Sequence, residues 1–276
     1  MGAFSLAGVG LALDVQADGS HRDHAAEAEA LGYSAVWLPG GQIDNLGRLT
    51  ELAQATTTIP VIPAVLSVGS YAAYEVAGLF ADLQRSNPCR FVPAFGGPQT
   101  PRPLQALREY LDRLDASQPS VPADRRLLAA LGPRKLELAR DRAAGAVPLL
   151  VTPEYTEHAR AVLGSDAILA IDQMVVLDTD PEAARAAARG PLRFLSTVGG
   201  YTANFARMGF TDVDIATLSS RLTDQLVAWG DADAVATRIH EHLRAGADHV
   251  FLTTIHDGNQ PGPIETARRL ADTLFR

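Results

Sequence analysis

Short apolar runs alternate with amphipathic segments along almost the whole chain. Eight runs are predicted to be buried strands, at residues 7–13, 34–38, 60–68, 90–95, 127–131, 147–151, 168–177 and 249–254. Between them, apolar residues recur every three or four positions, the spacing of one helix face. Eight short strands, each followed by a helix, are typical of a (β/α)8 barrel, the TIM barrel.

Two segments interrupt this alternation. Residues 96–126 are rich in proline with one helical stretch at 104–114, and residues 190–230 are largely helical in pattern. The first shows no shift of composition that would suggest a domain boundary, and we interpret both segments as insertions, after strands four and seven, in one domain of residues 1–276. An open doubly wound sheet is the alternative fold. It is disfavoured because Gly8-Val9-Gly10 lies within a strand, and no glycine-rich dinucleotide turn follows one.

The turn Leu131-Gly132-Pro133-Arg134 joins the fifth strand to a helix. Proline is favoured at the first helical position, where its missing N–H has no partner to lose. Backbone N–H groups at a helix N-terminus, with an arginine beside them, form a credible phosphate site. Taken alone, the same residues more often form a tight strand-to-helix turn that binds nothing, because helix N-termini are common and anion sites are few.

Composition limits the classes of partner that the protein is expected to bind and the compartment in which it is expected to work. The formal net charge of -8 argues against nucleic acid and anionic membranes, which need a basic face. The single cysteine, Cys89, fits a reducing compartment. No apolar run approaches membrane-spanning length, and no basic segment precedes an apolar run as in a signal peptide, so we expect a cytoplasmic protein. His21 and His24 lie one helical turn apart without a third ligand nearby, so no metal site is predicted.

In a TIM barrel, the loops after the strands build the ligand site. This rule selects polar and glycine-rich positions before any relative is considered. They are Asp14, Pro39–Gln42, Ser67–Ser70, Gly96–Gln99, Gly132–Arg134, Thr152–Glu154 and His256-Asp257.

Four runs of sequence resemble one family. They are AAEAEALGYSAVWLP (25–39), LAALGPRKLELARDRAAGAVPLLVTPEYTEHAR (128–160), VVLDTDPEAARAAAR (175–189) and WGDADAVATRIHEHLRAGADHV (229–250). Together they resemble, in order, the luciferase-like flavin and deazaflavin oxidoreductases, and among these the actinobacterial group that uses coenzyme F420. The resemblance implies a luciferase-like TIM barrel, a flavin-type ring over the barrel mouth, a small-molecule substrate and a homodimer.

The resemblance also implies particular cofactor contacts. A bulge with a non-prolyl cis peptide supports the ring in this family, and it matches Ser67 and Val68 here. The family's phosphate turn matches Gly132, Pro133 and Arg134. The glycines after strand four, Gly96 and Gly97, are expected beside the ring.

Hydride transfer needs positioning, water exclusion and a proton donor. His256 follows the last strand and could donate a proton near neutral pH, or be a solvated loop residue. Tyr201 is a second catalytic candidate. Asn204, Gln173 and Trp37 are candidates for substrate contacts; Asn204 and Gln173 could equally be structural, and a tryptophan placed like Trp37 more often belongs to the core.

The sequence thus predicts an F420-dependent oxidoreductase that transfers hydride to or from a carbonyl, imine or activated alkene. An FMN-dependent monooxygenase is the first alternative. A barrel that has lost its redox cofactor is the second. It is motivated by Pro39-Gly40-Gly41-Gln42 and Tyr71-Ala72-Ala73, where relatives commonly carry other residues.

Overall fold

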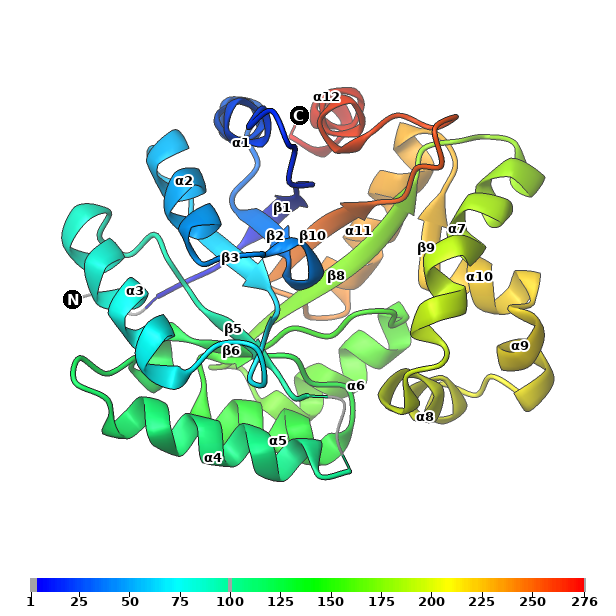
Figure 1. The fold of residues 1–276 in the computed structure, drawn as a ribbon. Coiled ribbons are helices and arrows are strands. Elements are labelled where there is room, and N and C mark those ends of the chain that lie inside the picture. The colour runs from blue at the N-terminus through cyan, green and yellow to red at the C-terminus, as the bar shows by residue number, and fades with distance from the viewer. Residues whose placement is uncertain (1–3, 99–100, 276) are drawn as a thin grey trace.

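Parallel strands form the centre of the molecule, and helices surround them (Figure 1). The computed structural model describes residues 4–98 and 101–275, so the predicted loop residue Gln99 lies outside it. The strands are β1 Gly8–Ala12, β2 Val36–Pro39, β3 Val61–Ala64, β4 Leu66–Ser67, β5 Ala94–Gly96, β6 Leu127–Leu128, β7 Gly145–Ala146, β8 Ile168–Val176, β9 Val227–Trp229 and β10 His249–Thr254.

The sheet closes on itself. Its order is β3-β2-β1-β10-β8-β7-β6-β5-β4, and β9 pairs with β8 outside this path. Strands β3 and β4 are two pieces of the predicted third strand, separated at the Ala64–Val65 peptide bond, which is cis. The first piece pairs with β2 and the second with β5, so the ring is complete. The predicted (β/α)8 barrel is confirmed.

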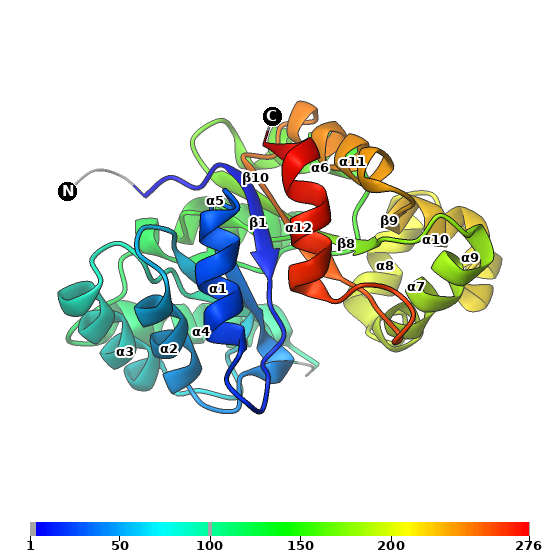
Figure 2. The same ribbon diagram turned by 90° about the horizontal axis from the view of Figure 1, so that it is seen from above.

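The helices form two groups. Those around the barrel are α1 His21–Ala30, α2 Gly47–Ala55, α3 Ala73–Ser86, α4 Pro103–Ala116, α5 Pro133–Arg142, α6 Pro153–Leu163, α11 Ala232–Arg244 and α12 Pro263–Leu274. The second insertion holds α8 Gly199–Arg207, α9 Asp212–Thr217 and α10 Ser220–Leu226, and α7 Pro181–Leu195 leads into it. Figure 2 shows α7 to α10 gathered at one side of the barrel, beyond β9.

Local sequence fixes where the helices begin. Thr152 and Asp231 cap α6 and α11, each accepting a backbone N–H three residues on, and Asp180 caps α7 in the same manner. Proline occupies the first position of α5 and α6. Each helix follows its strand after a short turn, from Leu128 to Pro133 and from Ala146 to Pro153, so its first residues lie at the end of the barrel where the strands stop.

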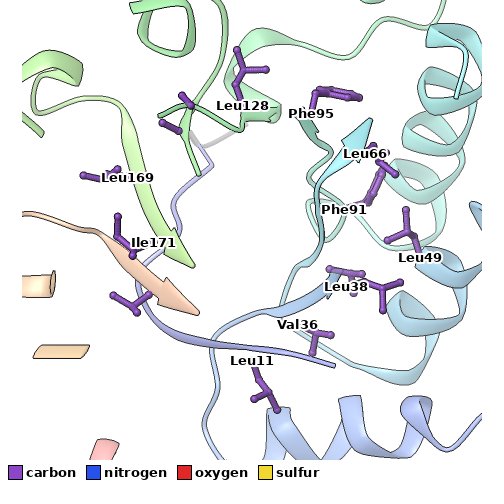
Figure 3. Packing of buried hydrophobic residues seen from close by; sticks show 14 of the residues in the cluster. Leu11, Val36, Leu38, Leu49, Leu66, Phe91, Phe95, Leu128, Leu169 and Ile171 are labelled. Carbon is purple, nitrogen blue, oxygen red and sulfur yellow. The ribbon is translucent and has the colours of Figure 1, made fainter. Parts of the chain in front are cut away.

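Three apolar clusters hold the parts together. The largest fills the layer between strands and helices, where Figure 3 shows Leu38 and Leu66 on the strand side and Leu49 on a helix. A second fills the barrel interior around Trp37 and Phe251. The third joins α7–α10 to β9 and the end of β8, so the insertion has a core of its own.

Several predicted strands have other bounds in the structure, and the fourth, predicted at 90–95, is observed as β5 at Ala94–Gly96. The sixth strand was predicted at 147–151, but the paired residues are Gly145–Ala146. Pro148 has no N–H to donate, so the regular ladder stops before it, and only an isolated bridge from Leu149 to Asp172 follows. The second insertion, predicted to be largely helical, also contains β9, which pairs with β8 at Met174–Val176.

Candidate functional site

A cavity of about 390 Å³ lies at the mouth of the barrel, and we call it the mouth cavity. Strand ends, the start of α5 and the α7–α8 segment contribute to it. Its lining includes Gly41, Ala64, Val65, Gly96, Gly97, Ala129, Ala130, Leu131, Lys135, Val147, Leu149, Asp172, Phe194, Leu195, Val198, Gly200 and Tyr201. This is the end of a TIM barrel at which ligands bind.

Ala64 and Val65 form one wall of the mouth cavity. Two glycines allow Val65 to lie there. A Cβ atom on Gly40 would be 1.9 Å from the Val65 carbonyl oxygen, and one on Gly96 would be 2.6 Å from Val65 Cγ2. Only a residue without a side chain permits such close approach. The wall is therefore apolar and is fixed by its neighbours.

Asp172 lies on the strand across the barrel from this wall. Between β8 and the β3/β4 strand lie β10, β1 and β2 on one side, and β7, β6 and β5 on the other. The Asp172 carboxyl accepts a hydrogen bond from Thr253 Oγ1 at 2.6 Å. Burial raises the pKa of Asp172 to about 7, although the bond from Thr253 acts in the opposite direction.

Two other titratable side chains line the mouth cavity within the described ranges, Lys135 and Tyr201. Burial, and then the charge of Asp172, raise the pKa of Tyr201 to about 12, so its hydroxyl keeps its proton at neutral pH. Burial lowers the pKa of the Lys135 ammonium group. The mouth thus combines a carboxyl, a phenol and an amine in a mostly apolar setting.

A second cavity of about 550 Å³ adjoins the first, and Leu131 lines both. We call it the side cavity. It lies between the starts of α5 and α6 and the insertion, and its lining is Leu131, Pro133, Thr152, Glu154, Tyr155, His158, Asn204, Arg207, Met208, Arg221 and Gln225. Its lining includes the guanidinium groups of Arg207 and Arg221 and one carboxylate, Glu154, so the arginines can offer N–H donors to an anion.

The two arginines differ in their partners. Arg221 forms an ion pair with Asp214 at 3.0 Å. Arg207 appears in none of the ion pairs between residues that the structure describes, and it contacts Asn204 Oδ1 at 3.5 Å. A Cβ atom on Gly132 would lie 3.6 Å from Arg207 Nη2, so the predicted phosphate turn and this arginine are neighbours.

No family model and no curated protein sequence matches the chain. Solved structures do resemble it. An F420-dependent secondary alcohol dehydrogenase in complex with an F420–acetone adduct has a TM-score of 0.72 at 16% identity, over 96% of this chain and 97% of that one. A coenzyme F420-dependent tetrahydromethanopterin reductase from Methanopyrus kandleri has a TM-score of 0.69 at 16% identity, over 97% of each chain.

A flavin enzyme is similar to the same extent. The oxygenating constituent of 3,6-diketocamphane monooxygenase from Pseudomonas putida, in complex with FMN, has a TM-score of 0.68 at 13% identity, over 97% of this chain and 98% of that one. The chain has the luciferase-like barrel fold. The resemblance in sequence is thereby confirmed at the level of fold.

Several predicted residues meet at the two cavities of this luciferase-like barrel. Gly96, Gly97 and Tyr201 line the mouth cavity. Pro133 and Asn204 line the side cavity. Their roles toward a cofactor or substrate stay predictions, but the luciferase-like fold does place them together.

His256 lies at the rim. Its Nε2 is 3.3 Å from Asp14 Oδ2, and Gln42 Nε2 donates to Asp14 Oδ1 at 2.7 Å. Three loop positions selected from the sequence are thus in contact. His256 itself is exposed and is not among the residues that line the mouth cavity, so its catalytic role also stays a prediction.

The two predicted substrate contacts on strands are instead buried in the structure. Trp37 is fully buried in the barrel interior, where its ring stacks on Phe251 at 3.8 Å and Nε1 donates to His249 Nε2 at 3.0 Å. Gln173 points out of the barrel and bonds to His242 at 2.9 Å. Successive residues of a strand face opposite sides, so Asp172 points inward in its place.

Two cofactor predictions are displaced by a few residues. The cis peptide is at Ala64–Val65 rather than at Ser67 and Val68, and the latter two are not part of the mouth lining. Arg134 is exposed and lines neither cavity. Its neighbour Lys135 faces the mouth cavity, because one step along a helix turns the side chain by about 100°.

Among the lining residues that the sequence analysis missed are Asp172, Lys135, Val65 and Arg207, and the first two left a signal in the sequence. Asp172 is the one charged residue in the run ILAIDQMVV, where a carboxylate has no reason to be unless it faces a cavity. Lys135 follows the predicted phosphate turn directly. Val65 depends on the close packing of Gly40 and Gly96, and Arg207 on the fold of the insertion, so neither could be found from sequence.

Residues 4–98 and 101–275 contain no group of three or more histidine, cysteine, aspartate or glutamate side chains placed to hold a metal ion. In the same ranges, none of the helices has both the length and the apolar character needed to cross a membrane.

Proposed function

We propose that the protein is an oxidoreductase that binds a deazaflavin coenzyme of the F420 type and transfers hydride between it and a small organic substrate. The observation that carries the proposal is that the mouth cavity and the side cavity share Leu131. A flat ring and an attached phosphate need two such adjoining spaces, one apolar and one cationic.

The lining of each cavity fits its half of the coenzyme. In the mouth cavity, the wall of Ala64 and Val65, with the backbone of Gly96 and Gly97, presents a mostly apolar surface that suits a flat ring. In the side cavity, the guanidinium groups of Arg207 and Arg221 suit phosphate, since arginine binds it through parallel N–H groups.

The bound coenzyme would supply or accept the hydride. The chain's own residues would orient the reactants and keep water away. Phe194, Leu195 and Val198 come from the end of α7 and the following turn and line the mouth cavity. They present apolar surface where the substrate would enter, which supports a small and largely apolar substrate. FMN has the same general shape, so the coenzyme must be decided by experiment.

The test is a fluorescence titration of the purified protein with coenzyme F420 and, separately, with FMN. Arg207→Ala should weaken binding of the favoured coenzyme about tenfold, which is the loss of one charge-assisted contact of roughly 1.4 kcal/mol. Arg134→Ala is the matched control. It removes an arginine at the start of α5 that lines neither cavity, and should leave affinity within about twofold.

The titration distinguishes an F420-dependent enzyme from an FMN-dependent one and from a barrel without a redox cofactor. Binding of F420 that Arg207→Ala weakens supports the proposal. If only FMN binds, and turnover consumes oxygen, the protein is an FMN-dependent monooxygenase and the F420 proposal is wrong. If neither coenzyme binds at micromolar concentration, the barrel has lost its redox role. If Arg134→Ala weakens coenzyme binding more than Arg207→Ala does, the phosphate binds at the turn predicted from the sequence and not in the side cavity.

A further inference from the structure

We propose that the Asp172 carboxyl is the proton donor and acceptor of the mouth cavity, and that the substrate is an uncharged ketone or aldehyde, or the corresponding alcohol, whose oxygen lies against it. The hydride transfer in this reaction rests on the proposed function. The assignment of the proton to Asp172 does not depend on it and can be tested without a coenzyme.

The position of Asp172 is the first argument. It lies in the same cavity as the Ala64–Val65 wall but on the strand across the barrel from it. A flat ring resting on that wall would turn its other face toward β8. A substrate on that face would then lie between the ring and the carboxyl, which is where a proton donor is needed.

The hydrogen bonding of the carboxyl is the second argument. The Asp172 side chain is 8% exposed and receives one hydrogen bond, from Thr253 Oγ1 to Oδ1. No other hydrogen bond to this carboxyl occurs within the part of the chain that the structure describes. Oδ2 thus remains available to an incoming hydroxyl or carbonyl oxygen in the cavity that the residue lines.

The charged and titratable groups facing Asp172 are few. Lys135 at the start of α5 and Tyr201 on α8 line the same cavity. Thr253 faces it from β10, and on the β7 side Leu149 and the carbonyl of Pro148 bring no charge. With little to stabilise the carboxylate, burial holds the pKa near neutrality, as a group that both gives and takes a proton requires.

The rest of the lining indicates the substrate class. Phe194 is 66% exposed although it lines the mouth cavity, and Leu195 and Val198 lie beside it. An apolar body would be favoured at this rim. An anionic substrate would meet the Asp172 carboxylate whenever that group has lost its proton. A neutral carbonyl compound suits both features.

The hydride and the proton reach different atoms of the substrate carbonyl. In the reducing direction, the carbonyl carbon accepts a hydride, with its two electrons, from the reduced coenzyme, while the C=O π bond breaks. The substrate oxygen takes the proton from Asp172, and an alcohol results. The carboxylate then regains a proton from solvent. In the oxidising direction, the carboxylate removes the hydroxyl proton as the carbon gives up its hydride.

The first experiment needs no coenzyme. Infrared spectra of the protein between pH 5 and pH 9 should show the C=O band of a protonated carboxylic acid that persists above pH 6 and fades near pH 7. Asp172→Asn should lack this band. Asp166→Asn, an exposed residue in the turn before β8, is the control and should retain it. A wild-type protein without such a band, with all carboxyls ionised from pH 5 upward, overturns the proposal.

The second experiment uses the coenzyme-loaded protein and a series of ketones and secondary alcohols of three to eight carbons. Asp172→Asn should lower kcat at least 100-fold, the scale of general acid–base catalysis, with KM and coenzyme affinity within about threefold of wild type. Thr253→Val removes a hydrogen bond that favours the carboxylate. It should retain activity and move the pH midpoint of kcat upward.

The two failures are distinguishable. If the wild type binds no coenzyme, the proposed function fails, and the infrared band alone decides whether Asp172 holds the proton. If coenzyme binds and Asp172→Asn keeps kcat within threefold, the carboxyl is not the donor. If coenzyme binds and none of the ketones or secondary alcohols reacts, the substrate class is wrong.

Discussion

His242 Nε2 and Gln173 Oε1 lie 2.9 Å apart in the layer between the barrel and α11. The other ring nitrogen of His242 lies 2.7 Å from Thr156 Oγ1 on α6. Burial lowers the pKa of this histidine to about 3, so the ring is neutral at pH 7. Three buried polar side chains thus join β8, α6 and α11, one residue away from the carboxyl that faces the mouth.

Gln173→Leu is predicted to destabilise the protein by about 1–3 kcal/mol, because it leaves a His242 ring nitrogen buried without a partner. Urea unfolding at pH 7 measures this loss. Gln105→Leu, an exposed glutamine on α4, is the matched control and should cost less than about 0.5 kcal/mol. Equal losses in the two variants would mean that the network contributes nothing. Coenzyme affinity should be unchanged in both.

Asp172 is predicted to make folding stability fall as pH rises from about 4 to about 7. Its pKa is about 7 in the folded protein and near 3.8 when unfolded, so the folded state binds more protons in this window. The full effect is about 4 kcal/mol, at 1.36 kcal/mol per pKa unit.

The stability of Asp172→Asn minus that of wild type isolates this effect from other groups. We expect the difference to increase by a few kcal/mol between pH 4 and pH 8, measured by urea unfolding. Asp166→Asn serves again as control, and its difference should stay flat. A flat difference for Asp172→Asn as well would show that its carboxyl titrates normally.

Gly40→Ala is predicted to destabilise the protein by about 1–3 kcal/mol or more and to weaken coenzyme binding. The new Cβ would lie 1.9 Å from the Val65 carbonyl oxygen, so the wall of the mouth cavity must move. Gly41→Ala is the control at the next position, where a Cβ would meet nothing within 4 Å. Its unfolding midpoint should match wild type. A tolerated Gly40→Ala would mean that the wall is not held as tightly as we describe.

Trp37→Phe is predicted to cost about 2 kcal/mol or more, since it removes the donor to His249 Nε2 and part of a stacked ring inside the barrel. Trp229→Phe also removes an indole donor, which bonds to Asp224 at 2.9 Å. There the tryptophan is half-buried, so water can replace the bond and the cost should stay below about 1 kcal/mol. Thermal unfolding of both variants would show whether the two losses differ in this order.

The strand–helix alternation made the barrel predictable, because eight buried strands with amphipathic partners leave few ways to cover every apolar face. The turn at Gly132 and Pro133 was located for a similar reason, since proline marks where α5 begins. Tyr201 and Asn204, two of the candidates named from the sequence, line the mouth cavity and the side cavity respectively.

Side-chain direction was harder to predict. Asp172 and Gln173 are adjacent in an apolar run, and the register of β8 decides which of them faces inward. That register depends on pairing with residues about 80 positions away, and the run itself gives no alternation to indicate it. The same holds for Arg134 and Lys135, because the rotation of α5 follows from packing of the whole helix. Single-residue errors therefore concentrate at the site.

Helix α8 contributes to both cavities, with Tyr201 in one and Arg207 in the other. Molecules that fill the two cavities separately would thus act on one rigid element. Any shift of α8 that favours the first would alter the affinity for the second, and thermodynamic reciprocity requires the same factor in the opposite direction. If one ligand fills both cavities, as proposed, the insertion that supplies α8 would couple the recognition of its two ends.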